Sequence, residues 1–319
     1  MGNPGLRLDM KKSVPFAIVA AALAAVAFLP RFASAYSVVF CSSVIMYAAL
    51  SLSYAMFSGP TGYVSLATAA FFGVGIYTSA FFGKSLPLPA LMIAGGVFSS
   101  VIAFAVGAIT LRLRGVYFTI FTFGLVELLK HFVLWTETTF AGTRGRTVAS
   151  FGSVTVFYCM LALLTALLLA AFLLRRSRVG KALSAIGESE DAAAHIGINT
   201  TAVKLLAFSL SSFAMGAAGA VMATRWAYID PGIAFNSLMS FMPALMAIFG
   251  GTDRLLGPVA GAIVFAALEE QLITRFPSLY MIIFGAIMIA AILFMPSGVT
   301  GLIRRRPAKR KEDVPVGDS

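Results

Sequence analysis

Apolar runs of about 20 residues, each long enough to cross a bilayer as a helix, recur along the chain. Hydrophobic residues make up 59% of the 319 residues and charged residues only 12%, against about 25% charged in soluble domains. The run 153–174 lacks the alternation of apolar and polar residues that a strand of a membrane barrel needs. The sequence therefore predicts an all-α, polytopic membrane protein.

About ten transmembrane helices are expected from the lengths and spacing of these runs. The predicted spans are 14–33, 36–57, 64–83, 87–110, 116–135, 153–174, 204–224, 237–250, 258–274 and 279–296. Only 237–250 is clearly short.

The placement of positive charge predicts the orientation. Seventeen of the 24 Lys and Arg residues fall in the segments that lie inside when the N-terminus is cytoplasmic. We therefore expect both termini in the cytoplasm. The net charge of +11 sits in short clusters between apolar runs, which argues against nucleic acid as a partner and for the lipid bilayer.

The chain reads as a single transmembrane domain over residues 1–303, followed by a basic tail, 304–319, that is predicted to be disordered and cytoplasmic. The first apolar run also has the outline of a cleavable signal peptide, ending at Ala33-Ser34-Ala35. Retention as a membrane anchor is favoured, because Pro30 and Arg31 crowd that site.

The longest polar insertion on the inside face is the loop 175–203. Acidic and capping residues open a short predicted helix there, and a glycine closes it. The residues concerned are Glu188, Glu190, Asp191, Ala192, Ala193 and Gly197. A short exposed helix on such a loop can dock into a groove of a partner protein, and the alternative is a solvated connector.

Four segments in order resemble the permease subunits of ATP-binding cassette (ABC) importers for branched-chain amino acids. They are 59–80, 111–132, 177–221 and 249–270. Within the third, Asp191-Ala192-Ala193 and Gly197 resemble the loop by which such permeases contact their ATPase, although Asp replaces the usual Glu and the downstream Ile-x-Leu-Pro is missing. The resemblance implies that 175–203 is a coupling loop.

The resemblance also implies partners. They are a second homologous permease subunit, two cytoplasmic ATPase subunits and a periplasmic or extracellular solute-binding protein, in a bacterial inner membrane. ATP and Mg would be bound by those ATPase subunits and no cofactor by this chain. The only partial phosphate-loop match ends at Gly83-Lys84-Ser85 and has Thr78 where the first glycine should be. The solute would be a branched-chain amino acid, with urea, amides and other amino acids as alternatives.

Gly59, Pro60, Thr61 and Gly62 are candidates for a helix break that lines the translocation pathway. The alternative is that these small residues, like Gly73 and Gly75, allow close helix packing.

Charged residues inside spans are the remaining candidates. They are Glu127, Lys130, His131 and Glu269. The first three share one face of a helix, and a structural ion pair among them is the favoured interpretation. A stand-alone secondary transporter or channel that uses Glu127, Lys130 and Glu269 is the alternative function. The sequence shows no catalytic triad or metal-ligand cluster, which argues against a membrane enzyme. The outer loop 136–152, with Arg144 and Arg146, is long enough to meet a binding protein.

Overall fold

A computed structural model describes residues 21–279, 282–287 and 289 of the chain. The helices are α2 (Ala35–Thr61), α3 (Thr68–Phe82), α4 (Leu88–Thr110), α5 (Val116–Thr136), α6 (Ser153–Arg176), α7 (Arg178–Glu188), α8 (Glu190–His195), α9 (Thr200–Met222), α10 (Pro231–Ala234), α11 (Leu238–Gly250) and α12 (Gly257–Arg275). Short helical turns lie at Leu29–Arg31, Glu137–Ala141 and Ala223–Arg225, the middle one a π-helix. The predicted all-α class is confirmed.

Six helical segments of the described residues are long and apolar enough to cross a membrane. They are Ala35–Thr61, Leu88–Thr110, Val116–Phe140, Ser153–Arg176, Thr200–Arg225 and Pro231–Gly250. The predicted span 64–83 is shorter than expected, because α3 begins only at Thr68. The predicted spans 14–33 and 279–296 lie partly outside the described residues, so the count of ten stays a prediction.

Helix α2 runs through the middle of the bundle and packs against α6, α7, α9, α11 and α12. On its far side, α9 packs against α3 and α4. Glycine permits that approach, since a Cβ on Gly75 of α3 would collide with the carbonyl oxygen of Gly216 in α9. The small residues predicted to serve close packing do so here.

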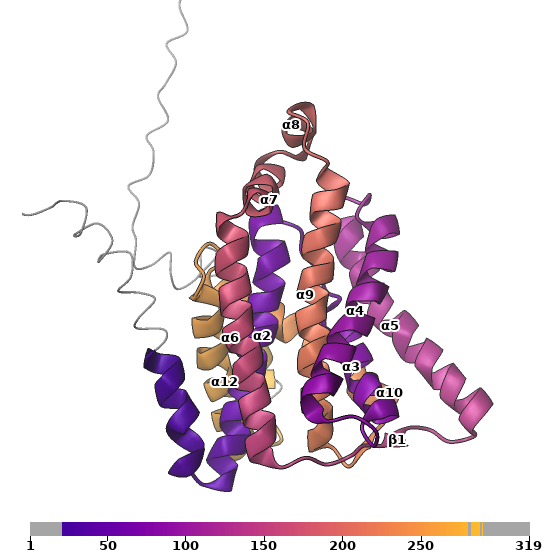
Figure 1. The fold of residues 1–319 in the computed structure, drawn as a ribbon, viewed down its shortest axis with the longest axis vertical. Coiled ribbons are helices and arrows are strands. Elements are labelled where there is room, and N and C mark those ends of the chain that lie inside the picture. The colour runs from indigo at the N-terminus through magenta and orange to yellow at the C-terminus, as the bar shows by residue number, and fades with distance from the viewer. Residues whose placement is uncertain (1–20, 280–281, 288, 290–319) are drawn as a thin grey trace, which may run out of the picture.

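The two ends of the bundle differ (Figure 1). At one end, here called the α8 end, α7 and α8 cap the bundle above α2, α6 and α9. At the other, the β1 end, β1 (Arg146–Thr147) pairs antiparallel with β2 (Tyr228–Ile229), which ties the loop after α5 to the segment after α9. The bundle thus has a helical cap at one end and, at the other, a clasp made of two short paired strands, β1 and β2.

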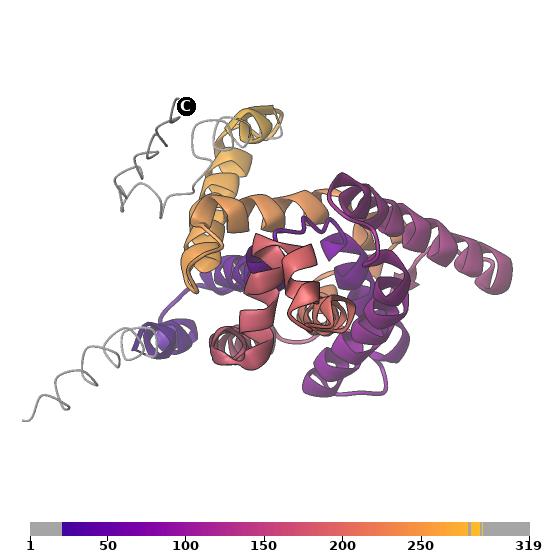
Figure 2. The ribbon, with the colours of Figure 1, turned by 90° about the horizontal axis from the view of Figure 1, so that it is seen from above.

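Helix α5 leans away from the other helices as it runs from the α8 end toward the β1 end (Figures 1 and 2). A row of large apolar side chains on it is exposed. These are Tyr117, Ile120, Phe121, Leu128, Phe132 and Trp135. One face of α5 therefore has no partner among the residues that the structure describes.

Candidate coupling site

Local capping builds α7 and α8 inside the loop 175–203. The Ser177 hydroxyl accepts a hydrogen bond from the Gly180 amide, 3.1 Å away, at the start of α7. Ser189 does the same for Ala192 at the start of α8, and Gly197 follows α8 with φ +88, a conformation that favours glycine. The helix predicted after Glu188 is confirmed. The preceding helix α7 occupies what was described only as loop.

A buried lysine holds α8 against the bundle. Lys204, in the first turns of α9, is 1% exposed at its side chain, and its Nζ lies 2.6 Å from Glu190 Oε1. The same ammonium donates to the Leu111 carbonyl oxygen at 3.0 Å and to the Tyr63 hydroxyl at 3.4 Å. One cation therefore connects α8 to the segments that follow α2 and α4. We call Lys204, Glu190, Tyr63 and the Leu111 carbonyl the Lys204 cluster.

Tyr63 closes the cluster from a second side. Its hydroxyl donates to Glu190 Oε2 at 2.5 Å, while the Lys204 ammonium lies 4.7 Å from the centre of the Tyr63 ring. A buried ammonium is costly unless it is paired and hydrogen-bonded. Here the carboxylate, the carbonyl, the hydroxyl and the ring face together satisfy it. Tyr63 follows Gly62, so the cluster begins where α2 ends.

The cluster also sets the ionisation of its members. Burial by itself would raise the pKa of Glu190, but hydrogen bonds from Lys204 and Tyr63 and the charges of Lys204 and Arg114 bring that pKa below its ordinary value. Burial and the neighbouring Glu190 carboxylate raise the pKa of the Tyr63 hydroxyl. Glu190 is thus a carboxylate and Tyr63 a neutral donor at neutral pH.

Asp191 occupies a different environment from Glu190. Its side chain is 72% exposed, and its Oδ1 lies 3.0 Å from the Arg114 guanidinium, which is also exposed. The Arg114 guanidinium approaches Glu190 less closely, at 3.9 Å. The ion pair of Asp191 is a surface contact, and such pairs contribute little. Within the predicted motif, Glu190 and Ala193 face the bundle and Asp191 faces solvent.

The segment at the end of α2 lies directly beneath α7. A Cβ on Gly187 would collide with the Pro60 carbonyl oxygen, so the last turn of α7 rests on the backbone of Pro60. Helix α2 continues through Pro60 to Thr61 and ends at Gly62, with φ +71. The predicted break is therefore a helix end at the α8 side of the bundle. The role of these residues in a pathway stays a prediction.

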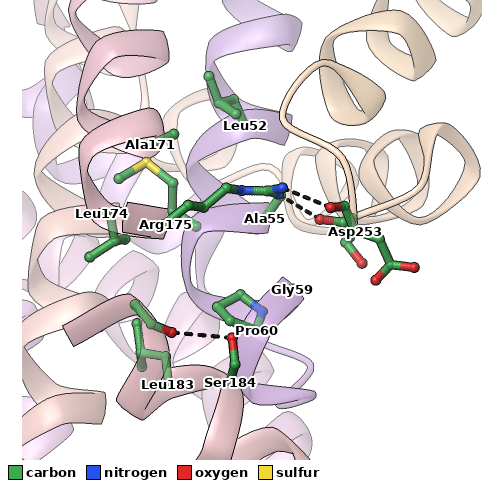
Figure 3. A pocket seen from close by; sticks show the side chains of 13 residues that line it. Leu52, Ala55, Gly59, Pro60, Ala171, Leu174, Arg175, Leu183, Ser184 and Asp253 are labelled. Carbon is green, nitrogen blue, oxygen red and sulfur yellow. Dashed lines mark hydrogen bonds between the residues drawn. The ribbon is translucent and has the colours of Figure 1, made fainter. Parts of the chain in front are cut away.

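A cavity of about 290 Å³ opens beside this segment (Figure 3). Gly59 and Pro60 line it from α2, and Arg175 reaches across it from α6. The Arg175 guanidinium donates to the carbonyl oxygens of Asp253 at 2.7 Å and Thr252 at 2.8 Å. A Cβ on Gly59 would come within 3.2 Å of the Thr252 Cβ. The end of α2 is thus enclosed between α7 and the loop before α12.

The charged residues predicted on α5 do lie together. Lys130 Nζ is 3.1 Å from Glu127 Oε2, and His131 Nε2 is 3.8 Å from the same oxygen. Ser237, just before α11, donates a 3.2 Å hydrogen bond to Glu127 Oε1. Glu269 has different neighbours, because it lies on α12 beside Tyr47 of α2.

The sequence profile described as "branched-chain amino acid transport system / permease component" matches residues 36–292. The chain belongs to this permease family. The high-affinity branched-chain amino acid permease protein LivM of Salmonella typhimurium is 25% identical, over 86% of this chain and 72% of the relative. LivH of Escherichia coli is 26% identical, over 80% of this chain and 91% of the relative.

More distant relatives include the L-arabinose ABC transporter permease AraH of Azospirillum brasilense, 26% identical over 39% of this chain and 38% of the relative. No solved structure matches the permease. The relatives named here are transport permease subunits, and the predicted resemblance to the branched-chain amino acid permeases is confirmed.

Two buried residues of the permease escaped sequence analysis. Lys204 enters the sequence analysis only as one of the 17 positive charges on the inside face, and its position 14 residues after Glu190, beyond a loop, gives no helical spacing that predicts a pair. Glu137 lies at the β1 end, where its Oε1 is 3.5 Å from Arg146 Nε and its Oε2 accepts from the Gly145 amide at 2.8 Å. Arg146, predicted to face a binding protein, pairs inside the permease and stacks on Phe81, 3.9 Å from the ring centre.

Proposed function

We propose that this permease is one of two membrane subunits of an ATP-driven importer in a bacterial inner membrane, and that α8 is the helix by which it engages an ATPase subunit. A solute-binding protein would deliver the solute to the opposite face. ATP and Mg would be bound by two ATPase subunits. The observation that carries the proposal is the way in which α8 is held.

Helix α8 is fixed on one face and open on the other. Glu190 and Ala193 point to the bundle, while Ala192, Ala194 and Ile196 are exposed, the last at 75%. An exposed apolar side chain beside small residues can pack into a groove of a partner protein. The buried Lys204–Glu190 ion pair fixes the helix to the bundle. A stand-alone carrier has no evident use for such an anchored cap.

The charge distribution supports a cytoplasmic α8 end. Arg112, Arg114, Arg175, Arg176, Arg178 and Lys181 lie on or beside the helices and loops of that end. Lys84, Arg144 and Arg146 line a surface hollow at the β1 end, and Arg225 lies near it. Over the whole sequence, 17 of the 24 Lys and Arg residues fall in the segments that the predicted topology places inside, and that topology puts the α8 end in the cytoplasm. The solute-binding protein would then approach the β1 end.

The proposed solute is a branched-chain amino acid. LivM and LivH are named as high-affinity branched-chain amino acid permeases. The match to AraH, named for L-arabinose, is a reason to test the solute directly.

The test is reconstitution of the full complex in proteoliposomes, with ATPase and binding-protein subunits from the same gene neighbourhood. ATP-dependent uptake of L-leucine is expected, with loss of uptake in a matched complex whose ATPase phosphate-loop lysine is replaced. Leucine uptake by this chain alone, driven by an ion gradient, would overturn the proposal. Ile196→Asp should abolish co-purification with the ATPase, while Lys181→Asp, at an exposed position of α7, should leave it intact.

A further inference from the structure

The ion pair on α5 lies at the middle of a membrane span. The candidate span Val116–Phe140 has 25 residues, so Leu128 is its middle residue. At about 1.5 Å per residue, Glu127, Lys130 and His131 lie within roughly 5 Å of that middle along the helix axis. The hydrocarbon core extends about 15 Å to either side of its centre. These charges are therefore at membrane depth and not at the interface.

The described residues cover the same charges only in part. The side chain of Glu127 is 39% exposed, that of Lys130 32% and that of His131 69%. Charged groups at this depth face a protein interior or a water-filled cavity, because lipid solvates them poorly. Within the described residues, α5 leans away from the bundle (Figure 2), and Ser237 is the residue before α11 that reaches Glu127. The face of α5 that bears the pair therefore borders water or another subunit in the assembled importer.

A second feature at the same depth points to a pathway. The chain between α9 and α11 is broken into short elements, β2 and α10, and α11 starts at Leu238, directly after the Ser237 that binds Glu127. Discontinuous helices that begin near the middle of the membrane surround solute sites in other transporters. Gly124, one turn before Glu127, is exposed and has open space where a Cβ would be, so the surface beside the pair is accessible.

The chemistry of the pair fits a particular class of solute. A carboxylate and an ammonium held 3.1 Å apart are complementary to the ammonium and carboxylate of a zwitterionic α-amino acid. Opening the ion pair would let Glu127 receive the solute's ammonium while Lys130 receives its carboxylate. Each charge then keeps a partner of opposite sign, so neither is left unpaired at membrane depth.

We propose that Glu127 and Lys130, with Ser237 beside them, form a solute-contact site that recognises the charged head of a zwitterionic amino acid as it crosses the membrane. The inference rests on the proposed function and extends it from the subunit to named residues. No part of it requires a proton relay, because the charges exchange partners and keep their protonation.

Charge reversal separates this role from a structural one. In the reconstituted complex, Glu127→Gln and Lys130→Gln should each lower the rate of L-leucine uptake about tenfold or more, while ATP hydrolysis stimulated by the binding protein is kept. The double variant E127K/K130E restores an ion pair but exchanges the positions of the two charges, so uptake should stay low. Uptake restored by the double variant would show that the pair only stabilises the fold and would overturn the proposal.

A matched carboxylate provides the control. Glu270 lies on α12, where it accepts a hydrogen bond from Tyr36. Glu270→Gln should leave leucine uptake unchanged. Absence of uptake in the wild-type complex would count against the proposed function instead. Cysteine labelling of the site does not depend on transport.

Cysteine labelling examines the site itself. In a variant without Cys41 and Cys159, a cysteine introduced by Gly124→Cys, at an exposed position one turn before Glu127, should react with a charged, membrane-impermeant thiol reagent. Millimolar L-leucine should slow that reaction several-fold, because Glu127 and Lys130 are both kept. Phe132→Cys, on the apolar face of the same helix, should react slowly with and without leucine. A Gly124→Cys thiol that is unreactive, or whose reaction leucine does not slow, would overturn the proposal.

Discussion

Lys204 Nζ lies 2.6 Å from Glu190 Oε1, and this contact joins the first turns of α9 to the first residue of α8. Tyr63, which is 141 positions before Lys204 in the sequence, also contacts this ion pair. A few hydrogen bonds thus connect α8 to the residue that follows α2. Under the proposed function, this connection would link an ATPase docked on α8 to the end of α2.

Removal of the ammonium tests this connection. Lys204→Met leaves Glu190 as a mostly buried carboxylate without its nearest cation, which should cost about 2–3 kcal/mol of stability. We expect normal membrane insertion, a lower melting temperature and loss of ATPase stimulation by the solute-binding protein. Lys181→Met, at an exposed position of α7, is the matched control. Full stimulation in Lys204→Met would contradict a coupling role for the cluster.

The two acidic residues at the start of α8 should differ in importance. Glu190→Gln removes the charge that Lys204 and Tyr63 both contact, whereas Asp191→Asn removes a solvent-exposed partner of Arg114. We therefore expect transport coupled to ATP hydrolysis to fall about tenfold in Glu190→Gln and less than twofold in Asp191→Asn. The ratio of leucine taken up to ATP hydrolysed is the measurement. Equal defects in the two variants would show that negative charge at the N-terminus of α8 matters, and not the contacts of Glu190 in the Lys204 cluster.

The local structure of this site could be predicted from the sequence, but its long-range contacts could not. The capping pattern at Ser189 and the stop at Gly197 are encoded within a few residues, so the position of α8 could be predicted. The partner of Glu190 could not, because a lysine after a loop looks like any other positive-inside charge. Tyr63 carries no local signal at all, since its role depends on how α2 and α9 pack.

The helix-break prediction shows the same division. Of the predicted break at 59–62, only Gly62 ends α2, because the helix continues through Gly59 and Pro60. Sequence alone does not say at which depth that end lies or what covers it. The structure places Gly187 of α7 against Pro60, a contact between residues of two separate segments. On α5, by contrast, Glu127, Lys130 and His131 are within one turn of each other, and helical spacing alone predicted their pairing.

The contact between Gly187 of α7 and the Pro60 carbonyl oxygen can be tested by a single substitution. Gly187→Val would force α7 away from the Pro60 carbonyl, because the added carbons have no room there. We expect uncoupled ATP hydrolysis with a loss of leucine uptake of about tenfold. Gly152→Ala is the control, as its nearest neighbour would be Thr155 Oγ1 at 3.9 Å. The result that contradicts the contact is normal uptake by Gly187→Val.

Acid should release α8. The pKa of Glu190 lies below its ordinary value of 4.5, so its ionised form stabilises the folded state. That stabilisation is complete at pH above the ordinary value and is lost as the pH falls through the lowered pKa. A spin label at Ile196, introduced by Ile196→Cys, should therefore become mobile only below about pH 4.5. In Glu190→Gln the label should be mobile at neutral pH, and an immobile label there would exclude Glu190 as the anchor.

At the opposite end, Glu137 should stabilise the clasp between β1 and β2. Its buried carboxylate faces Arg146 and accepts hydrogen bonds from the Gly145 amide and the Tyr77 hydroxyl, so Glu137→Leu removes all three contacts. Arg146 would remain partly solvated and stacked on the Phe81 ring. The folded state should therefore lose about 2 kcal/mol of stability, less than for a fully buried pair. Glu137→Gln keeps an acceptor and should lose about half as much. Melting temperatures of the purified permease measure both, and Thr138→Val, exposed next to Glu137, should leave the melting temperature unchanged.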